Sequence, residues 1–301
     1  MKLRAFACLP LLVALAAAPA QAAQVVQADA VVHTSRVQPT HQLAETLRIH
    51  VPYGNTPNTL GFRPAATERV AVGPAAFDVN AHGLVFVADP VRGKVFRFDP
   101  SQRQPALTAV APLPLPFADI ALDRDGNLHT ADVKTRSVTL VANSRRDVIP
   151  GSSHTMRFLR DGQDLVLRTG DARYLVRNGS ATARAARLDV EKCNAEAGLV
   201  TFGAKRVQLE IGAPLASIRL IGATNSGDVY LVVERFRKRG RLEVDREVVV
   251  LDARGRLKAK RDVVGVPVVH ATRDFALSPR GELYRMVPGT DGVTFVRWAV
   301  R

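Results

Sequence analysis

The sequence predicts an all-β fold of repeated small sheets, and three observations lead to this prediction. Apolar and polar residues alternate in runs of about four to eight, which is the pattern of β-strands. Clusters of Gly, Asp, Asn and Pro, the residues typical of turns, separate these runs. One segment of the chain also recurs. Hydrophobic residues make up 47% of the chain and charged residues 23%, a composition that buries a core and excludes wholesale disorder.

The recurring segment is a strand, a turn that contains glycine, and a second strand. Residues 77–89 match residues 120–132, so that Gly83 corresponds to Gly126. Weaker copies follow at 158–167, 221–231 and 275–284. A third strand is expected after most copies, at 94–99, 137–141, 247–252 and 293–298. Glycine at the turn permits a positive φ, and a preceding Asp, Asn or Ser can bond the turn backbone.

This repeat predicts a β-propeller. Three or four antiparallel strands every 40 to 50 residues or so is the spacing of a propeller blade, which buries its faces by stacking on its neighbours. With a degenerate copy expected at 199–211, the chain fits six blades, and five or seven are the alternatives. A strand at 46–51 is expected to close the ring by completing the blade built from 293–300. Residues 23–40 are expected to be a leader or an edge segment, and residues 41–301 a single propeller domain.

The first 22 residues have the pattern of an export signal. Lys2 and Arg4 precede an apolar run from Ala5 to Ala18, and small residues follow in 20–22. The run is too short for a stable spanning helix, and no later stretch reaches 18 apolar residues, so no transmembrane segment is expected after signal cleavage. The protein is therefore predicted to be periplasmic or secreted.

The chain is strongly basic, with 42 Lys and Arg against 28 Asp and Glu and a formal net charge of +14. Outside the cytoplasm this charge favours a protein or an anionic envelope polymer as partner, and it argues against nucleic acid. The densest basic run predicts a hairpin tip between strands at 230–234 and 247–252, and guanidinium forks suit phosphate or carboxylate. The alternative is a solvated tip without a ligand. The candidate anion-binding residues are Arg235, Arg237, Lys238, Arg239 and Arg241.

Other chemistry-bearing residues favour structural roles. Asp89 and Asp132 precede hairpins, where turn capping is expected. The turn 123–127 offers alternate oxygen ligands but lacks the distal Glu of a calcium loop, so no cofactor is predicted and a divalent cation is the minor alternative.

The histidines show no local zinc spacing, and His129 and His270 are expected to be packed or solvated. Cys193 is expected to be a buried small hydrophobe.

Three segments, 73–79, 83–89 and 93–99, together resemble the NHL repeat. Residues 117–141 resemble a second copy without the glycine-proline entry, and 272–298 a weaker third. The resemblance implies a β-propeller. The family serves mostly as a binding platform, whereas related propellers include lactonases and an amidating lyase, so the resemblance implies no single activity.

The sequence therefore favours an exported, noncatalytic propeller that binds a protein or an anionic envelope polymer. It contains no G-x-S-x-G elbow, phosphate loop or dinucleotide-binding glycine pattern, and no catalytic residue is assigned. The alternative is a metal-dependent hydrolase or lyase of the lactonase type, whose ligands would meet on the propeller axis. The side chains in the central channel distinguish these two functions.

Overall fold

A computed structural model describes residues 28–301, except 114, 116, 151–154, 171, 240, 265–267 and 270. Side chains are described for these residues except 238, 239 and 241–243. The described residues form 24 strands and no helix, which confirms the all-β prediction. They accordingly contain no helix long and apolar enough to cross a membrane. The predicted signal peptide, residues 1–22, lies outside the described residues.

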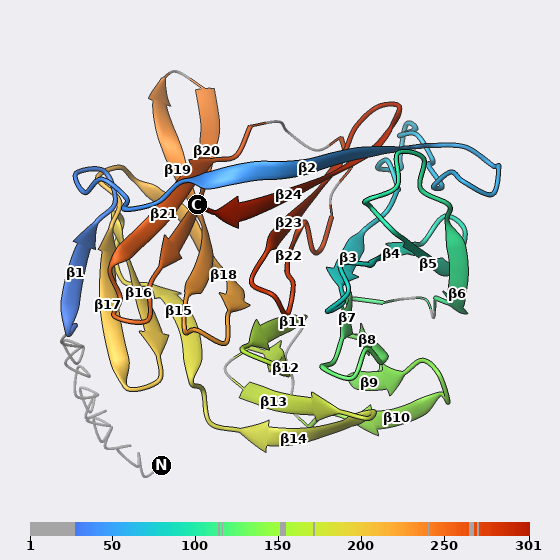
Figure 1. Ribbon diagram of the computed structural model, residues 1–301, viewed down its shortest axis with the longest axis horizontal. Helices are drawn as coiled ribbons and strands as arrows, with labels where there is room; N and C mark the ends of the chain where they lie inside the picture. The colour runs from blue at the N-terminus through green and yellow to red at the C-terminus, as the bar shows by residue number, and fades with distance from the viewer. Residues whose placement is uncertain are drawn as a thin grey trace, which may run out of the picture.

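The strands form four sheets of four strands and one sheet of eight (Figure 1). The first sheet contains β3 (Ala76–Val79), β4 (Val85–Asp89), β5 (Lys94–Phe98) and β6 (Thr108–Pro112). The second contains β7 (Asp119–Leu122), β8 (Leu128–Asp132), β9 (Ser137–Leu140) and β10 (Arg145–Val148). The third contains β15 (Leu188–Lys192), β16 (Ala197–Phe202), β17 (Lys205–Glu210) and β1 (Ala30–His33). The fourth contains β22 (Phe275–Leu277), β23 (Leu283–Pro288), β24 (Gly292–Val300) and β2 (Leu43–Pro52).

The eight-stranded sheet joins two groups of four strands. One group contains β11 (Met156–Asp161), β12 (Asp164–Thr169), β13 (Ala172–Arg177) and β14 (Ser180–Arg184). The other contains β18 (Leu215–Ala223), β19 (Val229–Arg239), β20 (Arg241–Leu251) and β21 (Leu257–Asp262). The groups meet through a short parallel pairing of β11 with β18, in which Arg160 lies opposite Gly222 and Asp161 opposite Ala223. A Cβ at Gly222 would lie 2.7 Å from the carbonyl oxygen of Arg160, so this close approach requires glycine.

The sheets are arranged radially, like the blades of a propeller. Their first strands, β3, β7, β11, β18 and β22, contact one another in a closed circle around the centre (Figure 1). Strand β15 packs beside β18, so the sheet of β15, β16, β17 and β1 flanks this circle. The fold therefore shows the radial stacking of small sheets that the repeat predicts.

Segments near the N-terminus complete two of the sheets. Strand β2 pairs antiparallel with β24 along its length, with Ile49 opposite Phe295, which confirms the closure predicted for residues 46–51. Strand β1 pairs in parallel with β17, so residues within 23–40 supply an edge strand. The copy expected at 199–211 corresponds to β16 and β17. Closure by a distant strand thus holds β2 and β24 in one sheet.

The predicted glycine turns are present in all five copies. Gly83 and Gly126 each have a φ of 83°, and Gly162, Gly227 and Gly281 are also at positive φ. In the first turn, the Asn80 side chain accepts hydrogen bonds from the backbone amides of His82 and Leu84, both at 2.9 Å. The local sequence therefore determines these turns, because the φ and the side-chain acceptor are both encoded within a few residues.

Apolar side chains fill the spaces between neighbouring sheets. Phe77 of the first sheet meets Phe295 of the sheet that closes the ring, with ring centroids 5.7 Å apart. Phe98 lies against the same ring at 5.1 Å. Edge-to-face contacts of this kind add to the stabilisation from burial, and they bind the first sheet to the last.

Candidate functional site: an arginine-rich face of the ring

The centre of the ring is occupied by buried charged side chains. Asp78 of β3 and Asp119 of β7 are 0% and 1% exposed, and Arg160 and Arg273 are buried beside them. Arg160 and Arg273 lie 3.6 Å and 3.5 Å from the Asp78 carboxylate. Arg273 also lies 3.8 Å from Asp119. Burial raises the pKa of Asp119, and the charge of Arg273 opposes this shift.

These charged groups also bind the backbones of neighbouring sheets. The Asp78 carboxylate accepts the amide hydrogen of Leu122, and that of Asp119 accepts the amide hydrogen of Phe158, both at 2.8 Å. Arg160 donates to the carbonyl oxygens of Leu277 at 2.9 Å and Leu122 at 3.0 Å. Each side chain thus joins one innermost strand to another. The centre is a structural network, and its carboxylates are already engaged by arginine and backbone groups.

A cluster of guanidinium groups surrounds one mouth of the ring. The arginine cluster consists of Arg157, Arg219, Arg246, Arg273 and Arg285. Asp274 lies among them and accepts hydrogen bonds from Arg219 at 2.8 Å and Arg246 at 2.6 Å. The Glu234 carboxylate forms a second ion pair with Arg246 at 2.6 Å. Arg273 also contacts Asp78 and Asp119 at the centre, so four carboxylates lie beside these five guanidinium groups.

Arg157 carries much of the resulting excess positive charge. It donates a hydrogen bond to a neutral acceptor, the carbonyl oxygen of Thr272, at 2.9 Å. Burial lowers the pKa of Arg157, and the charges of Arg219 and Arg273 lower it further, whereas the carboxylates of Asp119 and Asp274 oppose the shift. A cavity of about 10 Å³, close to the size of one water molecule, lies among these three arginines. The mouth is thus a place where a negative charge would be stabilised.

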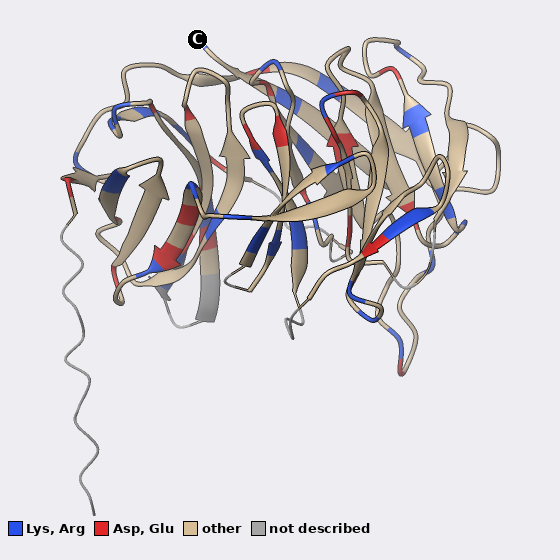
Figure 2. Cartoon of the chain, turned by 90° about the horizontal axis from the view of Figure 1, so that it is seen from below, with Lys and Arg blue, Asp and Glu red and all other residues tan. Residues whose placement is uncertain are grey.

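The predicted basic hairpin projects from the same face of the ring. Arg157 lies near the N-terminal end of β11, and Arg219 lies in the middle of the parallel strand β18, on the N-terminal side of its pairing with β11. Strand β19 is antiparallel to β18, with Arg235 opposite Leu215, so β19 and β20 extend beyond the ring at this end. Figure 2 shows Lys and Arg positions on neighbouring strands in the middle of the molecule. The hairpin and the arginine cluster therefore form one basic surface, which we call the arginine-rich face.

The hairpin arginines whose side chains are described have carboxylate neighbours. Arg237 forms an ion pair with Asp245 at 2.5 Å, and this hydrogen bond lowers the pKa of Asp245. Arg235 lies 3.5 Å from Glu247, whose pKa is raised by burial while Arg235 opposes the shift. The predicted hairpin is confirmed as strands β19 and β20. The candidates Lys238, Arg239 and Arg241 lie at its tip, where side chains are outside the described set.

The sequence did not single out the arginine cluster. Its members are isolated arginines on different strands, and the spacing between them in the chain exceeds any local motif. One available signal was the interruption of apolar strands by arginine, as in Ile218-Arg219-Leu220, where burial of a charge requires a partner. The partners come from other sheets, so only the packing of the ring brings the cluster together.

The two candidate carboxylates in the repeat cap turns, as predicted. Asp89 accepts the backbone amides of Val91 and Arg92, both at 3.1 Å, and that of Gly61 at 2.6 Å. Asp132 accepts the amide of Lys134 at 2.8 Å. These hydrogen bonds occupy the carboxylates in holding local structure.

The candidate cation turn is built around Asp123 and a buried histidine. Asp123 accepts the backbone amides of Asp125 and Asn127 at 3.0 and 2.9 Å. His129, fully buried, lies with Nε2 3.0 Å from the same carboxylate, so the expectation that it is packed is confirmed. Burial alone would raise the pKa of Asp123, but hydrogen bonds from His129 and Asn127 outweigh it and lower the pKa to about 2. His270 lies outside the described residues.

The pKa of Asp123 predicts an acid-dependent loss of stability. Because its folded value of about 2 lies below the ordinary value of 3.8, ionised Asp123 stabilises the fold above about pH 4 and loses this contribution as the pH falls toward 2. Asp123→Asn should flatten the decline of the unfolding free energy in this window, as measured by urea denaturation at several pH values. Asp125→Asn, at an exposed carboxylate, should leave the slope unchanged; an equal effect of both variants would contradict the prediction.

Two remaining predictions concern cysteine and metal. The prediction that Cys193 is buried is wrong: its side chain is exposed, and partial burial together with Glu191 raises the pKa of its thiol. The residue follows β15 at the start of a turn, where no apolar face covers it. Within the described part of the chain, no group of three or more His, Cys, Asp or Glu side chains is placed to hold a metal ion.

Comparisons with known proteins add fold neighbours only. No family model and no curated protein matches the chain. A streptogramin B lyase structure aligns at 10% identity and a TM-score of 0.45, over 85% of this chain and 98% of that one. A virginiamycin B lyase from Staphylococcus aureus aligns at 8% and 0.44, over 75% and 94%. A protein from Lactobacillus plantarum aligns at 13% and 0.42, over 84% and 92%. These neighbours are β-propeller proteins, and similarity at this level carries no inference about activity.

Proposed function

We propose that this protein is an exported, noncatalytic six-bladed propeller that binds an anionic envelope polymer, or a protein with an acidic surface, on its arginine-rich face. The observation that carries the proposal is the shared position of the arginine cluster and the β19–β20 hairpin at one end of the innermost strands. The cluster and the hairpin thereby place guanidinium groups at the same end of the sheets, and although Arg273 and Arg285 are buried, the combined positive charge favours a polyanion through long-range attraction and, at the exposed arginines, bidentate contacts.

The six-blade count follows from treating each four-strand group as one blade. The eight-stranded sheet is then two blades, joined where β11 pairs with β18 over only two residue pairs. The sheet of β15, β16, β17 and β1 is the remaining unit, displaced from the circle of innermost strands by this pairing. The NHL-like repeat of the first sheet supports the same view, because its turn and strand pattern recurs in the second.

An enzyme of the lactonase type is the alternative. Such an enzyme would place free carboxylates or histidines on the axis to hold a metal ion. Here Asp78 and Asp119 instead contact arginines and backbone amides, which supports the binding function. Elemental analysis of the purified protein distinguishes the two, since about one tightly held divalent metal ion per chain would favour the enzyme.

The binding proposal is tested with polyglutamate and lipopolysaccharide as probes and neutral dextran as a control. The double variant Arg237→Ala/Arg239→Ala should weaken polyanion binding about tenfold, and added salt should weaken binding by the unmodified protein. Arg254→Ala/Arg256→Ala removes the same charge from the β20–β21 turn, at the opposite end of β20, and should change affinity less than about twofold. Equal losses in both double variants, or binding that ignores salt, would reject the arginine-rich face as the site.

A further inference from the structure

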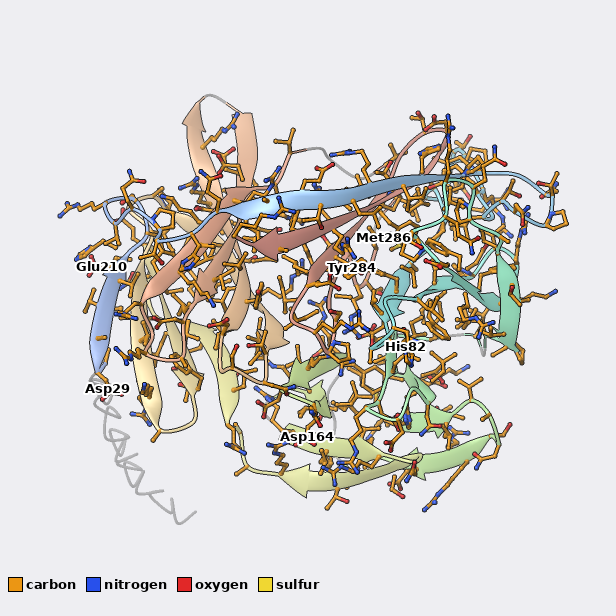
Figure 3. All side chains as sticks on the ribbon, in the orientation of Figure 1. Asp29, His82, Asp164, Glu210, Tyr284 and Met286 are labelled. Carbon is orange, nitrogen blue, oxygen red and sulfur yellow. The ribbon has the colours of Figure 1, made fainter. Side chains whose placement is uncertain are left out.

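A second candidate site lies where three groups of strands meet. The junction cleft has a volume of about 320 Å³ and is lined by the turns that follow β11, β16 and β18 and by residues between β14 and β15. The residues used below are Asp161, Asp164, Arg184, Arg187, Phe202 and Asn225. Asp164 is labelled in Figure 3. The cleft lies at the C-terminal ends of β11 and β18, whereas Arg157 lies near the N-terminal end of β11 and Arg219 in the middle of β18, so the two sites are separate.

At the junction cleft, the arginine side chains outnumber the carboxylates by one. Arg184 pairs with Asp161 at 3.1 Å and with Asp164 at 3.0 Å. Arg177 also pairs with Asp164, at 2.8 Å, and these arginines lower the pKa of Asp164 although burial opposes the shift. Arg187 is exposed and has no ion pair with any described residue. The carboxylates are thus neutralised, and Arg187 is available for an anion.

A smaller cavity continues the cleft inward. It has a volume of about 10 Å³, shares Asp161, Arg184, Arg187 and Leu188 with the junction cleft, and reaches the side chain of Arg173. Arg173 is 3% exposed, and its Nε has no hydrogen-bond partner in the structure, although its other nitrogens contact Asp189 and two carbonyl oxygens. A buried donor favours an acceptor beside it, and a cavity of this size admits one water molecule but not a sugar ring.

We propose that the junction cleft binds a small acidic sugar, a hydroxylated ring that carries one carboxylate. Arg187 would hold the carboxylate, and the engaged oxygens of Asp161 and Asp164, together with the Asn225 amide, offer hydrogen bonds to hydroxyl groups. Phe202 supplies an apolar surface for the ring. The volume is at the small end of ligand pockets, which fits one sugar unit and excludes a long polymer segment lying within it.

Titration calorimetry of the signal-free protein with glucuronate tests this proposal. Glucose, which lacks the carboxylate, should bind at least about tenfold more weakly, and glucose 6-phosphate separates a phosphate site from a carboxylate site. Arg187→Ala should weaken glucuronate binding at least about tenfold. Arg103→Ala, an exposed arginine in the β5–β6 loop, is the matched control and should leave binding unchanged.

The outcomes separate this site from the arginine-rich face. The Arg237→Ala/Arg239→Ala variant should retain full glucuronate affinity. Loss of polyanion binding at the arginine-rich face therefore leaves the proposed sugar site in the junction cleft unaffected. Absence of glucuronate binding up to about 10 mM, binding of glucose with equal affinity, tighter binding of glucose 6-phosphate, or unchanged affinity in Arg187→Ala would each overturn it.

Discussion

Asp78→Ala should destabilise the protein by about 3–5 kcal/mol, because it leaves two buried arginines without their shared carboxylate. The variant also removes the acceptor for the Leu122 amide, which joins the first sheet to the second. The expected consequence is a fall in the thermal midpoint of about 10 °C, measured by calorimetry on the purified protein. A loss this large would identify the centre of the ring as a principal source of stability.

Two variants distinguish the charge of Asp78 from its hydrogen bond. Asp78→Asn keeps an acceptor for the Leu122 amide and should be less destabilising than Asp78→Ala, although it still removes the charge facing Arg160 and Arg273. Arg256→Ala breaks an exposed ion pair with Asp252 and should change stability by less than about 1 kcal/mol. If Arg256→Ala destabilised the protein as much as Asp78→Ala, the buried network at the centre of the ring would not be a principal source of stability.

Gly222→Ala should destabilise the protein by about 3 kcal/mol and open the pairing of β11 with β18. The added Cβ would lie 2.7 Å from the carbonyl oxygen of Arg160 and 3.3 Å from its amide nitrogen. Both are backbone atoms, so the strand itself must move. Hydrogen exchange gives the local measurement: the Gly162 amide, which donates to the carbonyl oxygen of Ala223 at 3.0 Å, should lose protection.

Gly73→Ala is the matched control for this prediction. A Cβ at Gly73 meets its nearest neighbour, the Tyr53 hydroxyl oxygen, at 3.5 Å, an ordinary contact distance. Its stability should stay within about 0.5 kcal/mol of the unmodified protein. Similar stability of Gly222→Ala and Gly73→Ala would show that the two groups of strands in the eight-stranded sheet are not held together by close backbone approach.

The arginine-rich face shows where prediction from sequence succeeds and fails. The hairpin at 229–251 was predictable, because alternating strands and a basic tip are visible within one continuous segment. Arg157 and Arg219 were not, since they lie far apart in the chain and meet only through the pairing of β11 with β18. The exposure of Cys193 was likewise not predictable from the residues next to it, because the burial of a turn depends on which sheet covers it.

The sequence by itself determined the strands of the repeated segments, their glycine turns and the closing strand near the N-terminus. Each depends on residues close together or on an alternating pattern that fixes which face is buried. Only the tertiary structure decided what occupies the centre of the ring, which arginines share a mouth, and that β11 meets β18 to form the junction cleft. These features arise from contacts between segments distant in the chain, whose energies depend on burial and on partners that a local pattern does not specify.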